Sequence, residues 1–186
     1  MFVVVEGIDG AGKDTQINLL RNKMQFAYFK HPTRTFPTMR DYLDGKLHLE
    51  PKALFLLFLS DIANEQEKIA DNRELTIVDR YVFSTIAYEI EGISYYEAKG
   101  IVEAVGYHPP DKVILFDIPA DYASTRKKSQ KKPDRYESNP GYLERVRERF
   151  LQLAEEKFLT PNWTVIDASG KIEDVHRDFV RALKPQ

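Results

Sequence analysis

A glycine-rich segment, Gly7-Ile8-Asp9-Gly10-Ala11-Gly12-Lys13, directly follows a short apolar run and constrains the fold of this 186-residue chain more than any other feature. The run before it, Phe2-Val3-Val4-Val5, is aromatic and β-branched, as expected of a strand buried on both faces. Glycines allow a tight turn whose N–H groups point at a phosphate, and the helix that follows adds its positive end. Lys13 supplies a full charge to the outer phosphates, which an ordinary glycine-rich turn would lack. The segment predicts a P-loop that binds ATP through Gly7, Ile8, Asp9, Gly10, Ala11, Gly12, Lys13, Asp14 and Thr15.

Strand-like runs alternate with helix-like segments along the rest of the chain. The runs are 26–29, 75–78, 113–116 and 163–166. The clearest helix starts near Asn139-Pro140 and places Leu143, Val146, Phe150, Leu153 and Ala154 on one stripe. This alternation predicts an α/β fold of the P-loop type, with a five-stranded parallel sheet, helices on both faces and ligands beyond the carboxyl ends of the strands. We expect a single domain over residues 1–186.

Composition excludes several other classes of protein. A net charge of -2 gives no global attraction to nucleic acid or to an anionic membrane, so we expect neither as a partner. The absence of cysteine excludes disulfides, thiolate metal sites and cysteine catalysis, and it fits a reducing cytoplasm. No apolar run is long enough to span a bilayer. We therefore expect a soluble cytoplasmic protein.

Asp79-Arg80-Tyr81 follows the predicted strand 75–78 and forms a second candidate site. A carboxylate beside a P-loop can hold Mg²⁺ or its water, and a neighbouring arginine can bridge two phosphates, although such a pair is as often a surface ion pair. Asp14 stands where a P-loop usually has the Ser or Thr that holds Mg²⁺. We expect Asp79, and Asp14 through water, to hold the metal; an acid in the first turn of a helix also suits the helix dipole.

A basic run over residues 126–135 follows the predicted strand 113–116. It is either a solvated or nucleic-acid-binding loop, or a mobile lid that closes on a triphosphate and excludes water. Because a P-loop is already present, we favour a lid over about 126–137 that adds arginine to the charge developing on the transferred phosphate.

Several motifs together resemble those of the thymidylate kinases, within the nucleoside monophosphate kinases. The resemblance covers nearly the whole chain, and its most specific parts are VEGIDGAGK at 5–13 and DRYVFSTIAYE at 79–89. It continues with His31-Pro32-Thr33-Arg34, Leu56-Leu57-Phe58, PDKVILFDI at 110–118, the segment ending Asp134-Arg135-Tyr136-Glu137 and Val165-Ile166-Asp167-Ala168.

The resemblance implies transfer of the γ-phosphate of ATP to dTMP, with Mg²⁺, in a homodimer. It implies that Asp9 binds the 3′-hydroxyl of the acceptor sugar, that Arg34 and Arg80 hold the acceptor phosphate, and that Phe58 stacks on thymine. It further implies that Ser84 lines the base pocket and that Tyr88 lies under the sugar and excludes a 2′-hydroxyl. The resemblance also implies that the catalytic arginine lies either in the P-loop or in the lid. This P-loop carries no arginine, so the lid must supply it, as in the bacterial type, and the candidates are Arg126 and Arg135.

Two departures from the family pattern leave other readings open. Ile62 stands where the family usually has an arginine that donates to thymine O4, which suggests a kinase of broader or shifted base specificity. Asp14 suggests a P-loop protein that binds nucleotide to regulate a partner without turnover. Adenylate kinases also lack Ser or Thr at this position, and Lys13-Asp14-Thr15-Gln16 resembles their segment.

Overall fold

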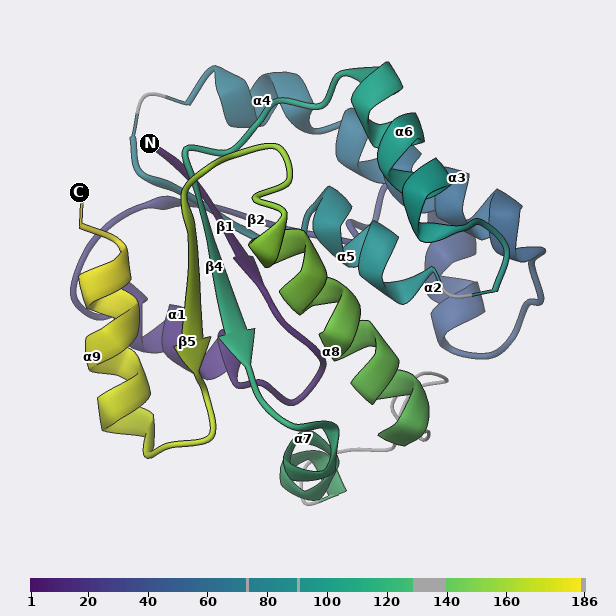
Figure 1. Cartoon of the computed structure of the whole chain (residues 1–186). Helices are drawn as coiled ribbons and strands as arrows, with labels where there is room; N and C mark the ends of the chain where they lie inside the picture. Colours follow the sequence, from purple (N-terminus) through teal and green to yellow (C-terminus); the bar gives the residue numbers. More distant parts are fainter. Residues whose placement is uncertain (73, 90, 129–139, 185–186) are drawn as a thin grey trace.

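The computed structural model describes residues 1–72, 74–89, 91–128 and 140–184, and within them five parallel strands form one sheet (Figure 1). The spatial order is β2-β3-β1-β4-β5, which places the first strand of the chain at the centre. The strands are β1 (Phe2–Glu6), β2 (Ala27–Lys30), β3 (Thr76–Asp79), β4 (Lys112–Asp117) and β5 (Trp163–Asp167). The predicted strands are confirmed to within one residue at each end. Asp79 is the last residue of β3 rather than the residue after it.

Helices cover both faces of this sheet, as predicted for the α/β class. Figure 1 shows α8 crossing one face with α5 beside it, while α1 lies on the opposite face; α1 packs against α9. The helices of the described residues are α1 (Lys13–Arg21), α2 (Pro37–Leu43), α3 (Pro51–Ala63), α4 (Gln66–Ala70), α5 (Val82–Tyr88), α6 (Tyr95–Val105), α7 (Ala120–Lys128), α8 (Pro140–Glu155) and α9 (Ile172–Ala182). None of them is both long enough and apolar enough to cross a bilayer.

The hydrophobic core lies on both sides of the central strand. Val3, Val4 and Val5 have no exposed surface, because β1 is flanked by β3 and β4 and covered by helices on each face. This explains why the strand is a continuous apolar run rather than an alternating one. The predicted stripe of α8 is likewise buried, and it packs the helix against β4 and β5.

The parallel sheet brings the carboxyl ends of β1, β2 and β3 to one edge. In the strand register Val5 lies opposite Asp79, and Lys30 lies opposite Asp79 on its other side. The P-loop leaves β1 at this edge, and the Asp79-Arg80-Tyr81 segment leaves β3 beside it. The two segments predicted to form a site are therefore neighbours.

Candidate functional site

The P-loop turns from β1 into α1, which begins at Lys13. Gly10 has a backbone φ of +85°, and a Cβ added there would lie 2.7 Å from the carbonyl oxygen of Ala123 in α7. Glycine is therefore required by both the backbone conformation and the close approach of α7. The buried ammonium of Lys13 donates to the carbonyl of Gly7 at 2.7 Å. Burial, together with the positive charge of Arg80, lowers the pKa of Lys13 to about 8.

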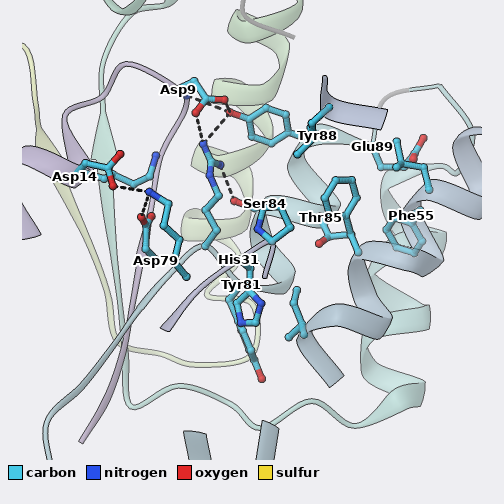
Figure 2. A pocket seen from close by; sticks show the side chains of 18 residues that line it. Asp9, Asp14, His31, Phe55, Asp79, Tyr81, Ser84, Thr85, Tyr88 and Glu89 are labelled. Atoms are coloured by element: carbon cyan, nitrogen blue, oxygen red, sulfur yellow. Dashed lines mark hydrogen bonds and ion pairs between the residues drawn. The ribbon is translucent and has the colours of Figure 1, made fainter. Parts of the chain in front are cut away.

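A cavity of about 230 Å³ opens beside the P-loop (Figure 2). One end is charged, where Asp9, Asp14 and Asp79 gather, and the other end, near Phe55, is largely apolar. The predicted site residues that line the cavity are Asp9, Lys13, Asp14, Phe58, Asp79, Arg80, Ser84 and Tyr88. Ile62 lines it too, so the departure from the family pattern falls within the cavity.

Asp9, Arg80 and Tyr88 form one hydrogen-bonded group at the charged end. Arg80 donates to one carboxylate oxygen of Asp9 at 2.6 Å, and the hydroxyl of Tyr88 donates to the other at 3.0 Å. Arg80 also donates to Oγ of Ser84 at 3.0 Å. Burial alone would lower the pKa of Arg80, but the negative charges of Asp9, Asp79 and Glu6 outweigh it and raise that pKa. The guanidinium is thus held rigidly as a cation.

The backbone of Arg80 is itself unusual. Its φ is +69°, in the left-handed region that few residues other than glycine adopt. Such a conformation persists only where surrounding contacts hold it, and it is most common at functional sites. Here its N–H donates to the carbonyl of Val5 at 3.1 Å, which fixes the turn between β3 and α5 against the central strand.

Glu6 is a fully buried carboxylate at the end of β1 that the sequence analysis missed. It accepts hydrogen bonds from the N–H of Tyr81 (2.8 Å) and of Ser84 (3.2 Å), and from the hydroxyl of Ser84 (2.6 Å). Burial raises the pKa of Glu6 to about 7, although Arg80 and these hydrogen bonds oppose the shift. Glu6 therefore ties the start of α5 to the P-loop strand. An acid directly after a run of buried valines was the available signal.

Lys30 is a second residue that the sequence analysis missed. Its ammonium lies between two carboxylates, 2.9 Å from Asp79 and 2.5 Å from Asp14. The oxygen of Asp79 that Lys30 contacts is Oδ2. The hydroxyl of Tyr28 donates to the same oxygen at 3.2 Å. The other oxygen of Asp79, Oδ1, is buried and accepts no hydrogen bond among the described residues.

The opposite end of the cavity is suited to a flat apolar group. Phe58, Phe55 and Ile62 contribute side chains from α3, and Ile62 is almost completely buried. Glu89 lies at the same end in Figure 2, and its Oε1 accepts from the N–H of Gly92 at 2.6 Å. A planar ring held between aromatic and aliphatic side chains, with a carboxylate near its edge, fits this shape.

Some predicted residues do not line this cavity: Arg34, Arg126 and, in the P-loop segment, Gly7, Ile8, Gly10, Ala11, Gly12 and Thr15. Arg34 is exposed in the turn after β2, next to Thr33, whose N–H donates to the buried Asp61 of α3 at 2.7 Å. Arg126 lies in α7 and donates to the carbonyls of Ala168 (2.9 Å) and Ser169 (3.1 Å). Arg135, with most of the predicted lid, lies outside the described residues.

Comparison with known proteins gives consistent matches over the whole chain. The family model for thymidylate kinase matches residues 5–179. The chain is 32% identical to a probable thymidylate kinase of Methanocaldococcus jannaschii, over 99% of this chain and 96% of that protein. It is 30% identical to the thymidylate kinase of Fervidobacterium nodosum, over 98% of each. A solved structure of thymidylate kinase from Candida albicans is described as revealing the origin of broad substrate specificity. It matches this chain with a TM-score of 0.77 at 23% identity, over 96% of this chain and 88% of that one. This match supports the fold.

Proposed function

The chain belongs to the thymidylate kinase family, and we propose that the cavity beside its P-loop carries out the transfer of the γ-phosphate of ATP to dTMP, giving dTDP. The observation that supports this placement is that Lys13, Arg80 and Phe58 line the same cavity. It combines a phosphate-binding lysine, a fixed arginine and an aromatic ring suited to a base.

The acceptor lies along the cavity in this proposal. Phe58 stacks on thymine, the ring of Tyr88 lies under the sugar, and Asp9 accepts from the 3′-hydroxyl. Arg80 holds the acceptor phosphate in line with the donor. Arg34 joins it by turning its exposed side chain inward from the turn that Thr33 ties to α3.

Phosphoryl transfer depends on alignment and on neutralising charge, so we assign no general base. Lys13 stabilises the outer phosphates of ATP, and the P-loop amides from Gly7 to Thr15 bind the rest. Arg80, on the acceptor side, stabilises the negative charge that develops on the transferred phosphate. A lid arginine, Arg126 or Arg135, completes the neutralisation and the lid excludes water.

The residues present fit a magnesium ion. Oδ1 of Asp79 is a buried acceptor that no described residue satisfies, and carboxylate oxygen is the ligand that Mg²⁺ prefers. We propose that Asp79 holds Mg²⁺ through this oxygen, with Asp14 joining through water. The ion would neutralise charge on the donor phosphates when bound.

We also propose that the protein is a cytoplasmic homodimer. Leu56 on α3 is 51% exposed, and Tyr96 and Val105 on α6 are also exposed apolar side chains. Large exposed apolar groups of this kind are common where a partner covers them. Sedimentation or light scattering of the parent and of Leu56→Glu would test the dimer, because the charged variant should be monomeric.

An assay with ATP, Mg²⁺ and a panel of monophosphates tests the function directly. dTMP should be the best acceptor, and Lys13→Ala should remove turnover while circular dichroism and melting remain those of a folded protein. Lys23→Ala, at an exposed lysine just after α1, is the matched control and should behave as the parent. Turnover of Lys13→Ala within severalfold of the parent would exclude this cavity as the active site. Nucleotide binding without turnover by the parent would favour the regulatory reading.

A further inference from the structure

The ammonium of Lys30 connects two acids that lie on different elements. Asp14 belongs to the first turn of α1, and Asp79 ends β3. Figure 2 shows Asp14 and Asp79 both bonded to one nitrogen, which is Nζ of Lys30. One cation therefore pairs with two anions, and all three side chains line the cavity.

Asp14 is the unexpected anion of the two, because a P-loop usually has a neutral Ser or Thr at this position. It directly follows Lys13 and lines the same cavity. A carboxylate there interacts well with the positive end of α1, but under the proposed function it would also repel the phosphates of a bound nucleotide. A neutral hydroxyl at this position would cause no such repulsion.

The sheet holds Lys30 in place to counter this charge. Lys30 is the last residue of β2 and lies opposite Asp79 in the register, and the next N–H, of His31, donates to the carbonyl of Asp79 at 3.0 Å. The side chain of Asp79 is 1% exposed, whereas that of Asp14 is 72% exposed. An isolated ion pair as exposed as Lys30 and Asp14 would contribute little. The buried carboxylate of Asp79 anchors the ammonium, so its position near Asp14 is fixed in advance.

We propose that Lys30 is a positioning residue of the phosphate site, which shields Asp14 so that this carboxylate can occupy the start of α1 without repelling nucleotide phosphates. The proposal rests on the proposed function, since it requires that the cavity bind a nucleotide. It makes the requirement for Lys30 conditional on Asp14. A lysine that contacted phosphate directly, or that only supported Asp79, would be required whatever stood at position 14.

The test is binding of ADP, measured by calorimetry in EDTA without divalent metal, to the parent, Lys30→Met, Asp14→Asn and the double variant. Lys30→Met should weaken ADP binding about tenfold or more, because Asp14 is then unshielded. Asp14→Asn should bind at least as tightly as the parent. The double variant should return to within about threefold of Asp14→Asn.

Lys46→Met is the matched control. Lys46 also contacts two acids, Asp41 at 3.4 Å and Asp44 at 3.1 Å, but it does not line the cavity, so its loss should leave ADP binding unchanged. Melting curves establish that each variant is folded.

Two results separate this proposal from the proposed function. If the parent binds ADP and the double variant stays as weak as Lys30→Met, Lys30 acts on phosphate or through Asp79, and the shielding of Asp14 is wrong. Unchanged binding by Lys30→Met would exclude it equally. If the parent itself binds no ADP, the assignment of the cavity as a nucleotide site is wrong and the proposal is overturned with it.

Discussion

Tyr88 and Asp9 are joined by two hydrogen bonds in opposite senses. The hydroxyl of Tyr88 donates to the carboxylate of Asp9 at 3.0 Å and accepts from the N–H of Asp9 at 3.2 Å. The last residue of α5 is thereby fixed to the P-loop, 79 positions earlier in the chain. Because the ring also packs near Phe150, its position along the cavity wall is set on two sides.

A fixed ring at this place should discriminate between sugars. We expect Tyr88→Ala or Tyr88→Gly to raise activity on a ribose acceptor relative to the matching deoxyribose acceptor, because the space for a 2′-hydroxyl opens. Tyr88→Phe keeps the ring and should keep the preference, even if loss of its bonds to Asp9 lowers the rate. Rates with dUMP and UMP give the ratio. A ratio that is the same in all variants would make Tyr88 a packing residue.

The two lid arginines should differ in their effects. Arg126 donates to the loop after β5, so we expect Arg126→Ala to lower stability by about 1–3 kcal/mol, as for lost hydrogen bonds from a charged group. We expect Arg135→Ala to lower kcat by roughly 10³ to 10⁵, the range for an arginine that meets transferring phosphate. Steady-state kinetics and melting distinguish them. If Arg126→Ala lost turnover but kept its stability, the result would contradict a purely structural role. It would mean that the side chain of Arg126 leaves the loop after β5 and acts on the nucleotide.

With Ile62 in the cavity, the enzyme should discriminate less sharply between pyrimidine bases than it would with an arginine at this position. Isoleucine offers no donor to O4 of thymine, and cytosine carries a donor at the same place, so we expect dTMP to remain best with a smaller margin over dCMP. Ile62→Arg should widen that margin on the order of tenfold, and Glu89 lines the same cavity as a partner for the guanidinium. Ile62→Met, which adds no donor, is the control and should leave the ratio alone. Sharp rejection of dCMP by the parent, unchanged in Ile62→Arg, would mean that another residue binds O4.

Glu6 should make stability depend on pH. Its pKa is raised from 4.5 to about 7, so the folded protein holds the proton more tightly than the unfolded chain does. Its contribution is therefore complete below pH 4.5 and is lost as pH rises through 7. We expect the free energy of unfolding of the parent to fall by about 3 kcal/mol over this window relative to Glu6→Gln.

Urea unfolding at several pH values would measure this difference. The exposed Glu103→Gln is the control and should follow the parent at every pH. Parallel curves for the parent and Glu6→Gln would show that folding leaves the pKa of Glu6 unchanged, because its hydrogen bonds to Ser84 and Tyr81 offset burial.

The sequence could predict features that depend on neighbours along the chain. Examples are the valines of β1, the glycines of the P-loop and the apolar stripe of α8. Each of these depends only on the backbone conformation or the burial of its own segment. The position of Asp79 beside Lys13 also followed, because parallel strands share an edge.

Features that depend on strand register or on side-chain reach could not be predicted. Lys30 meets Asp79 only because β2 pairs with β3 in one register, and β2 gave no sign of which strand it would join. In the sequence, Arg126 is one of several cations in a basic run. Nothing in that run indicates that its guanidinium donates to the carbonyl of Ala168, 42 positions later. The raised pKa of Glu6 likewise arises from burial that only the assembled fold creates.

The contact at Gly10 joins the P-loop directly to α7. Gly10 lies against the carbonyl of Ala123 with no room for even one methyl group between them. Ala123 lies in α7, on which the predicted lid begins. Movement of the phosphate-binding turn toward this helix would therefore push α7, and movement away would open a gap in a packed contact. We therefore expect a displacement of Gly10 on nucleotide binding to reach α7 through a residue that has no side chain of its own.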